Sequence, residues 1–226
     1  MGMLVAAAAA FVGIHVLIAG SPLRGIIVRR TGEGAFRGLF SLLSLGAIVW
    51  LCRAYAQAPT LALWQPPHAA RMAAPVLVLL AFLLVVLGIT TPSPTATGGE
   101  NLLQQAEPAH GVLRITRHPF LWGVAVWAAA HLLVNGDAAS IVLFGAFLVL
   151  ALVGPRSIDA KRDARFGAAW QRFAAVTSSV PFAAVIGGRN RVVLAELGWW
   201  RLAAATAVYV VALGLHRQVF GVSPLP

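Results

Sequence analysis

Two histidines lie inside apolar stretches of this 226-residue sequence, where an ionisable side chain is costly and marks a candidate functional site. His15 lies in the first of these stretches, and His131 lies in the stretch that begins at Pro119. Neutral imidazole is a common axial ligand of haem iron, so two histidines on facing helices could hold one haem between them. Alternatively, each imidazole is satisfied by a serine or a backbone carbonyl, and both interpretations stay open.

A stripe of residues on one face of a predicted helix surrounds His131. Positions spaced by four lie on the same face of a helix, and this stripe has four members: Gly123, Trp127, His131 and Asn135. A glycine beside a tryptophan and a histidine would let a flat macrocycle approach the backbone, and Asn135 could hold the second ring nitrogen of His131. The predicted depths of His15 and His131 differ by roughly 9 Å, at about 1.5 Å of rise per residue, and helix tilt would have to absorb this difference.

A second kind of site is predicted where Arg117, His118 and Pro119 follow one another. Proline suits the first turn of a helix, so the two residues before it would lie at the boundary between membrane and cytoplasm. Asp159 lies seven residues before Phe166 and would project from the apolar face of a later helix. We therefore expect Arg117, His118 and Asp159 to converge on one polar site with a catalytic role. Anchoring of Arg117 to lipid phosphate is the alternative, but it gives His118 no role.

The elements that position these residues are expected to be membrane helices. Hydrophobic residues make up 59% of the sequence and charged residues only 11%, and the mean hydropathy is +0.83. Because roughly a quarter of the residues in a soluble domain are charged, this chain lacks the polar surface to cover itself in water. We expect residues 1–226 to form a single membrane domain. The sequence has no Ser-His-Asp order, CxxC pair, P-loop or GxGxxG motif, so hydrolase, zinc and nucleotide sites have no support.

Several apolar stretches approach the roughly 20 residues that a helix needs to cross a hydrocarbon core. Their ranges are about 3–20, 38–56, 73–91, 119–135, 138–155 and 198–216. The fourth is short and is joined to the fifth by Asn-Gly-Asp at 135–137, a tight-turn signal that predicts an antiparallel hairpin. The sequence therefore predicts an all-α integral membrane bundle of about six transmembrane helices.

The net charge of +10 also follows from a membrane location. Lys and Arg accumulate in cytoplasmic loops, and of the 17 basic residues only Arg53, Arg71 and Arg217 fall on the other side of the predicted bundle. This asymmetry predicts cytoplasmic segments at 92–118 and 156–197, with both termini periplasmic. It explains the charge without a nucleic-acid partner and leaves membrane lipid as the expected surroundings.

An amphipathic pattern follows the fifth apolar stretch. Phe166, Trp170 and Phe173 recur with helical spacing, and a group of basic residues shares roughly the opposite face: Lys161, Arg165 and Arg172. This pattern predicts a cytoplasmic amphipathic helix that lies on the membrane surface.

Three segments of the sequence resemble the NnrU family of bacterial membrane proteins. They include "HVLIAGSPLRGIIVRR" from residue 15, "RITRHPFLWGVAVWAAAHLLVNGD" from residue 114 and "TSSVPFAAVIGGR" from residue 177. The resemblance implies a multi-pass protein of the bacterial inner (cytoplasmic) membrane, tied to denitrification and the response to nitric oxide.

The zeta-carotene isomerases are similar to that family, and they isomerise a polyene with the help of haem b. This similarity implies haem b as a cofactor, His15 and His131 as its metal ligands, and a hydrophobic polyene or lipidic substrate. Trp127 and Asn135 would then lie in the cofactor site. The implied function is a haem-dependent isomerase or a redox or nitric oxide responsive component.

A more distant resemblance connects the segment "RHPFLWG" at 117–123 and the later "FGAAWQRF" to isoprenylcysteine and phospholipid methyltransferases. It implies an S-adenosylmethionine-dependent methyltransferase of a lipidic substrate as the alternative function. The sequence departs from that pattern, because Ile158-Asp159 stands where two glutamates are expected. A non-enzymatic membrane assembly factor, in which the histidines are structural, is the third alternative.

Overall fold

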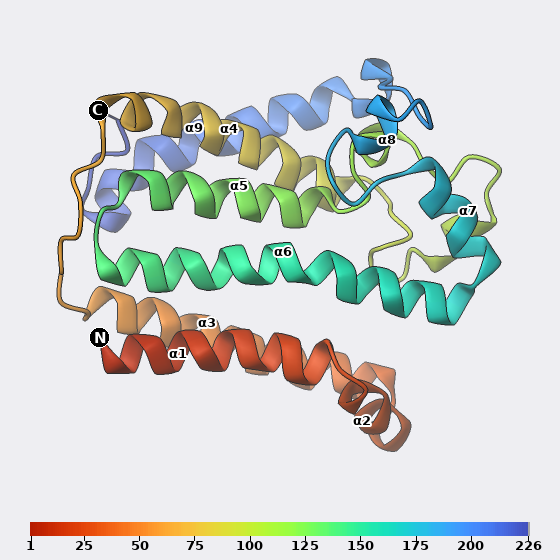
Figure 1. The fold of residues 1–226 in the computed structure, drawn as a ribbon, viewed down its shortest axis with the longest axis horizontal. Coiled ribbons are helices and arrows are strands. Elements are labelled where there is room, and N and C mark those ends of the chain that lie inside the picture. The colour runs from red at the N-terminus through yellow and green to blue at the C-terminus, as the bar shows by residue number, and fades with distance from the viewer. Residues whose placement is uncertain (226) are drawn as a thin grey trace.

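The computed structural model describes residues 1–225, and its body is a bundle of long apolar helices (Figure 1). Five helices among these residues are long and apolar enough to cross a membrane: Gly2–Ala19 (α1, Gly2–Gly13, continued by the π-helical η1, Ile14–Ala19), α3 (Glu33–Ala56), α4 (His68–Thr90), α6 (Ala138–Phe166) and α9 (Trp199–Phe220). A sixth apolar helix, α5 (Pro119–Val134), has 16 residues and is about 24 Å long, so it is shorter than a hydrocarbon core of about 30 Å. The predicted all-α membrane bundle is confirmed.

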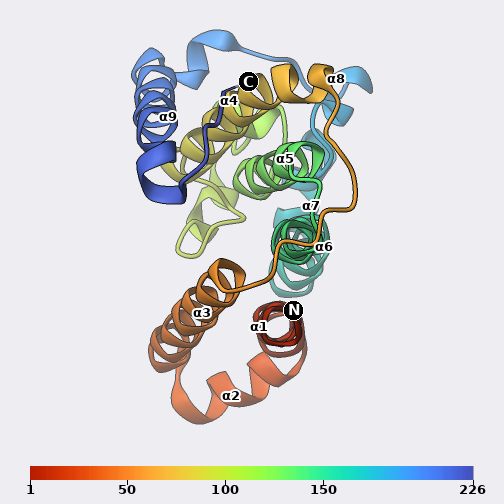
Figure 2. The same cartoon turned by 90° about the vertical axis from the view of Figure 1, so that its left-hand side faces the viewer.

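The long helices follow one another along an arc when they are viewed end on (Figure 2). The order is α9, α4, α5, α6, α1 and α3, and each packs against the next. Helix α6 joins the two halves, because α5 packs on one side of it and α1 on the other. Both chain termini lie at the same end of the bundle, called the terminal end below, and the opposite end is called the capped end (Figure 1).

The predicted hairpin between α5 and α6 is confirmed. Asp137 caps the first turn of α6, because its carboxylate oxygen accepts a hydrogen bond of 2.9 Å from the backbone N–H of Ser140. Helices α4 and α5 pack closely where glycine removes a side chain. A Cβ atom on Gly123 would lie 2.6 Å from the Cγ2 atom of Val85, so only glycine allows this approach.

Two predictions about the segment after residue 155 are wrong. Helix α6 passes through Pro155 and ends only at Phe166, so its 29 residues span about 43 Å and extend beyond a hydrocarbon core. The predicted amphipathic helix is not continuous, since Gly167 adopts a φ of 48° and separates α6 from α7 (Ala168–Val176). Trp170 and Phe173 of α7 do not face lipid. They are buried against the loop that follows α4.

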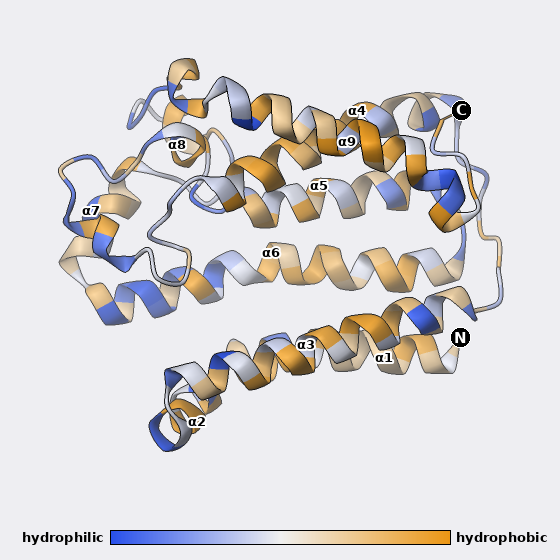
Figure 3. Cartoon of the chain, turned by 180° about the vertical axis from the view of Figure 1, so that it is seen from behind, coloured by the Kyte–Doolittle hydropathy of each residue, from blue (hydrophilic) through white to orange (hydrophobic). Residues whose placement is uncertain are grey.

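The capped end is built from the segments on either side of α5 and α6. Five short elements lie there or beside it: α2 (Leu23–Thr31), η2 (Glu100–Gln104), η3 (Gly111–Arg114), α8 (Ala183–Ile186) and η4 (Leu194–Leu197). Figure 3 shows hydrophilic colouring over α2, the last part of α6 and the loops near α7, whereas the middle of the helices is mostly apolar. The polar residues with candidate chemistry therefore collect at this end.

Candidate functional site at the start of α5

Arg117 and Asp159 form a close ion pair at the capped end. Arg117 immediately precedes the first turn of α5, and Asp159 lies on the extension of α6. The Nη2 atom of Arg117 donates to Oδ2 of Asp159 at 2.6 Å, and its Nε atom lies 3.0 Å from the same oxygen and 3.1 Å from Oδ1. This two-pronged geometry fixes the plane of the carboxylate.

His118 completes the group of three. Its Nε2 atom donates to Oδ1 of Asp159 at 2.8 Å, and its side chain is only 1% exposed. The carboxylate of Asp159 therefore joins a guanidinium and an imidazole that come from neighbouring positions in the sequence. The predicted convergence of Arg117, His118 and Asp159 is confirmed, whereas a catalytic role for them stays a prediction.

Backbone contacts from the loop after α7 hold this part of the chain in place. The N–H of Arg117 donates to the carbonyl of Ser178 at 2.9 Å. Thr116 and the indole N–H of Trp122 both donate to the carbonyl of Ser179, each at 2.7 Å. Because these bonds cross between segments about 60 residues apart, the start of α5 is fixed by the folded cap and not by α5 alone.

An aromatic ring lies beside the ion pair. The guanidinium carbon of Arg117 lies 5.9 Å from the ring centre of Trp170, a distance at which a cation is attracted to the face of an indole. Trp170 is buried through α7, so the break at Gly167 is what brings this ring back toward α5.

A second ion pair stabilises the same end and was missed by the sequence reasoning. Arg114 donates to both carboxylate oxygens of Glu196, at 2.7 and 2.9 Å, and the N–H of Gly111 donates to the same carboxylate at 2.7 Å. The hydrogen bond from Arg114 is the main cause that lowers the pKa of Glu196 to about 2. Arg114 and Glu196 are 82 positions apart, and neither carries a motif that would pair them.

A third ion pair closes the loop after α4. Arg162 donates to Glu100 at 2.8 Å and to the backbone carbonyl of Ala96 at 2.8 Å. The hydrogen bond from Arg162 is the main cause that lowers the pKa of the Glu100 carboxyl below its usual value. At the capped end, these ion pairs therefore connect the loops to the start of α5 and the last part of α6.

The structure does not bring His15 and His131 together. His15 lies in η1, which continues α1, and His131 lies in α5, so α6 stands between their helices. The start of α1 and the end of α5 both lie at the terminal end (Figure 1). Counted at about 1.5 Å of rise per residue, His15 lies about 20 Å beyond the start of α1, whereas His131 lies about 5 Å before the end of α5. The predicted placement on facing helices is therefore wrong.

The two histidines lie at the ends of a file of aromatic rings. The ring of Phe11 lies 4.8 Å from His15 and 5.2 Å from Phe147, measured between ring centres. Phe147 lies 5.4 Å from Trp127, and Trp127 lies 4.9 Å from His131. Three rings therefore separate the two imidazoles, and α6 supplies the ring in the middle.

Each of these histidines is satisfied by its own helix. The Nδ1 atom of His15 donates to the carbonyl of Phe11 at 2.7 Å, and that of His131 donates to the carbonyl of Trp127 at 2.8 Å. The amide of Asn135 donates to the backbone carbonyl of His131 at 2.9 Å, so Asn135 does not hold the imidazole ring as predicted. The alternative that a backbone carbonyl satisfies each ring is the one the structure shows.

The predicted space for a macrocycle beside Gly123 is also absent from the described residues. The side of α5 that carries Gly123 is filled by the backbone of α4 at Ala81 and Val85. Bis-histidine haem binding needs ligand nitrogens about 4 Å apart on either side of the iron, and the separation of the rings by α6 and three aromatic side chains does not fit it. Each histidine alone, however, keeps Nε2 as the ring nitrogen that a metal could take, because Nδ1 is already committed.

In the comparison with known proteins, a single family model covers almost the whole chain. The family model described as "NnrU protein" matches residues 3–224. The chain is 35% identical over 81 residues to the chloroplastic 15-cis-zeta-carotene isomerase of Zea mays, and 34% identical over 80 residues to that of Arabidopsis thaliana. These alignments cover 36% and 35% of this chain and 22% of each relative, so the chain matches less than a quarter of their length. No solved structure matches the chain.

Proposed function

The chain belongs to the NnrU protein family, and from this premise we propose that it is an isomerase-like membrane protein that acts on a hydrophobic polyene or lipidic substrate. Two observations support the proposal: the similarity to the plant 15-cis-zeta-carotene isomerases and the polar group at the start of α5. The observation that carries it is the buried imidazole of His118, held by Asp159 at the end of an apolar bundle.

In this proposal His118 is the catalytic residue, and Asp159 and Arg117 position it. With its Nε2–H held by Asp159, the doubly protonated imidazole of His118 can give the proton on Nδ1 to one carbon of a conjugated double bond and take a proton back at the same nitrogen. Protonation of one carbon turns the former double bond into a single bond. The substrate can then rotate about this bond before loss of the proton restores the double bond. Atoms and electrons balance, since the proton returns to the imidazole. Because the side chain of His118 is only 1% exposed in this structure, the proposal requires its surroundings to open when substrate enters.

We also propose haem b as a cofactor, held by one histidine and not by a pair. His15 and His131 each have the Nδ1–H committed to a backbone carbonyl, the arrangement that leaves Nε2 for a metal. Haem b bound at either residue would supply redox chemistry or bind nitric oxide. A link to denitrification belongs to the same proposal, as does a location in the bacterial inner membrane with both termini periplasmic.

The function is tested with purified protein in lipid vesicles that contain 15-cis-zeta-carotene. We expect the 15-cis isomer to decrease and a trans isomer to appear on chromatography, and we expect His118→Ala to slow this at least about 100-fold. His68→Ala is the matched control, because His68 is exposed at the start of α4, and it should leave the rate unchanged. Equal rates with and without wild-type protein, with haem b supplied, would refute the isomerase proposal.

The alternative methyltransferase gains no support from the site. In that function Arg117 would have to help hold S-adenosylmethionine, but its guanidinium is already taken by Asp159 and lies beside Trp170. Transfer of a labelled methyl group from S-adenosylmethionine to the lipids of the same vesicles would favour the methyltransferase over the isomerase.

A further inference from the structure

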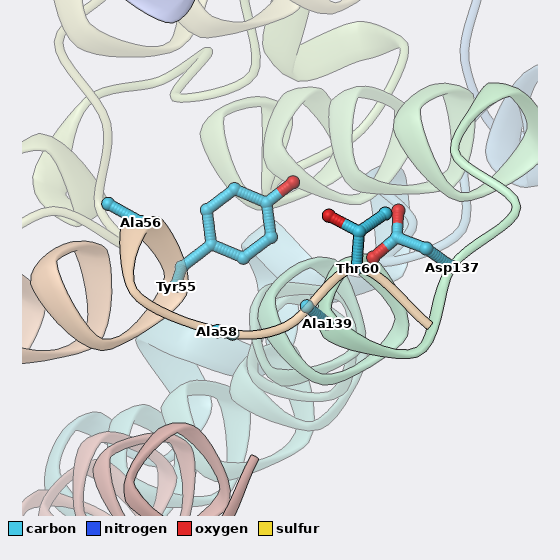
Figure 4. A pocket seen from close by; sticks show the side chains of 6 residues that line it. All are labelled: Tyr55, Ala56, Ala58, Thr60, Asp137 and Ala139. Atoms are coloured by element: carbon cyan, nitrogen blue, oxygen red, sulfur yellow. The ribbon is translucent and has the colours of Figure 1, made fainter. Parts of the chain in front are cut away.

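A polar pocket lies at the terminal end of the bundle, far from the group at the start of α5. Its volume is about 210 Å³. The last turn of α3, the connecting segment after it and the start of α6 line the pocket with six residues: Tyr55, Ala56, Ala58, Thr60, Asp137 and Ala139 (Figure 4). The proposed function leaves this pocket without a role.

The connecting segment at 57–67 forms a wall of the pocket and is fixed in place. It crosses the start of α6 on its way from α3 to α4 (Figure 2). The N–H of Leu63 donates to the carbonyl of Gly136 at 2.7 Å, and the N–H of Ala138 donates to the carbonyl of Leu61 at 3.0 Å. A Cβ atom on Gly136 would overlap the carbonyl oxygen of Trp64, so this contact requires glycine. The pocket is therefore part of the folded structure.

The hydroxyl protons of Ser140 and Tyr55 beside the pocket are already used. The Oγ atom of Ser140 donates to Oδ2 of Asp137 at 2.6 Å. Because this commits the proton of Ser140, the hydroxyl of Tyr55 must donate to Ser140 Oγ, 3.0 Å away. Tyr55 and Asp137 then present only lone pairs to the pocket, and Figure 4 shows the side chain of Thr60 between the Tyr55 hydroxyl and the Asp137 carboxylate. Such a site suits a ligand that donates hydrogen bonds.

The charge of the pocket is negative. Asp137 is in none of the ion pairs between the described residues 1–225. The carboxyl-terminal end of α3, the negative end of its helix dipole, lies at the pocket, and Arg53 in its last turn is not among the lining residues. The opposing dipole of α6 is already capped by Asp137. The ring of Tyr55 adds an aromatic surface, which attracts cations.

We propose that this pocket binds a primary ammonium group, as carried by the head group of an aminophospholipid or by free ethanolamine. An ammonium donates hydrogen bonds without accepting any, so it matches the lone pairs of Asp137 and Tyr55. About 210 Å³ accommodates an ethanolamine group but not a whole lipid. The pocket lies where α3 ends its apolar span, the depth at which a head group lies when the acyl chains run beside the helix.

The test uses the full chain in nanodiscs that contain equal amounts of phosphatidylethanolamine and phosphatidylglycerol. Native mass spectrometry of the released protein counts the retained lipids of each class. The informative variant is Asp137→Asn, because asparagine is as good a helix cap as aspartate, while it removes the charge and replaces one acceptor oxygen by an N–H donor. Asp163→Asn is the matched control, since Asp163 is exposed at the capped end.

We expect the wild-type protein and Asp163→Asn to retain phosphatidylethanolamine at least fivefold over phosphatidylglycerol, and Asp137→Asn to lose this preference. Equal retention by the wild type, or a preference that survives in Asp137→Asn, would overturn the proposal. Competition by millimolar ethanolamine identifies the free amine as sufficient, and its failure identifies the lipid head group as the ligand. A thermal unfolding curve of Asp137→Asn that matches the wild type shows that the variant is folded.

Discussion

The group at the start of α5 and the two histidines of the aromatic file obtain their hydrogen-bond partners in different ways. At the start of α5, His118 and Arg117 are satisfied by Asp159, a side chain about 40 positions away on another helix. His15 and His131 are satisfied by carbonyls one turn earlier on their own helices. The first arrangement exists only when the helices have packed, whereas the second needs no neighbouring helix.

This difference determines how much stability is lost when one member of each group is replaced. Removing one member of an ion pair across helices leaves a buried charge without a partner, which is costly. Removing an imidazole that bonds only to its own helix leaves a carbonyl that already accepts the helical hydrogen bond, so the cost is small. The capped end should therefore dominate stability among the polar sites, and the histidines of the aromatic file should remain free for a ligand.

The largest expected effect is that of Asp159→Asn. Asparagine keeps the shape of the side chain but removes the charge that compensates Arg117, whose side chain is only 14% exposed. We expect the free energy of unfolding to fall by about 3 kcal/mol, as for other broken buried pairs. Denaturant-induced unfolding in detergent micelles, followed by circular dichroism, measures this change.

Asp163→Asn controls for the loss of one negative charge from the same stretch of α6. Asp163 is exposed and accepts a hydrogen bond of 3.3 Å from Gln171, so the change should stay within about 0.5 kcal/mol. If the two variants have the same free energy of unfolding, the ion pair at the start of α5 stabilises the protein no more than an exposed carboxylate does. That result would contradict the expected dominance of the capped end.

A smaller effect is expected from Glu196, the carboxylate of the other pair at the capped end. Its pKa is about 2 in the folded protein, mainly because of the hydrogen bond from Arg114, and its ordinary value is 4.5. A lowered pKa in the folded state means that the pair stabilises the protein fully above pH 4.5 and that this contribution is lost as the pH falls from 4.5 toward 2.

Comparison of the wild type with Glu196→Gln isolates this contribution from the other titrating groups. We expect the variant to be less stable by about 1 to 2 kcal/mol at pH 7 and by less than half of that at pH 3. Glu107→Gln is the control, because Glu107 also contacts Arg114 but its side chain is 81% exposed. A difference between wild type and Glu196→Gln that does not shrink with acid would show that the charge of Glu196 is not what stabilises this end.

Much of the fold could be predicted because it depends on local sequence. Runs of apolar residues gave the long helices, Asn-Gly-Asp gave the hairpin, and Pro119 gave the start of α5. The convergence of Arg117 and Asp159 could be predicted because both residues lie at the same end of adjacent antiparallel helices. Depth along a helix follows directly from residue counts, so residues at matching depths on a hairpin meet.

The order of the helices around the bundle could not be predicted. Nothing local to His15 or His131 indicates that α6 lies between their helices, since all these helices are apolar on most sides. The end of α6 was also placed too early, because Pro155 suggested a boundary that the helix passes through. Contacts between distant loops, such as that of Arg114 with Glu196, depend on how the cap folds over the helices, and no spacing in the sequence encodes them.

The smallest expected effect on stability is that of replacing the histidines of the aromatic file by phenylalanine. In His131→Phe the ring can keep its stacking on Phe144, whose centre lies 4.6 Å from that of His131, and only the bond to the Trp127 carbonyl is lost. We expect the free energy of unfolding to change by less than about 1 kcal/mol, and the same for His15→Phe. If the wild type is purified with haem b, one of the two variants should lose the haem absorption and the other should keep it, because three rings separate the two imidazoles. Loss of the absorption in both variants, with unfolding unchanged, would show that both histidines hold the haem and that the helices rearrange to bring them together.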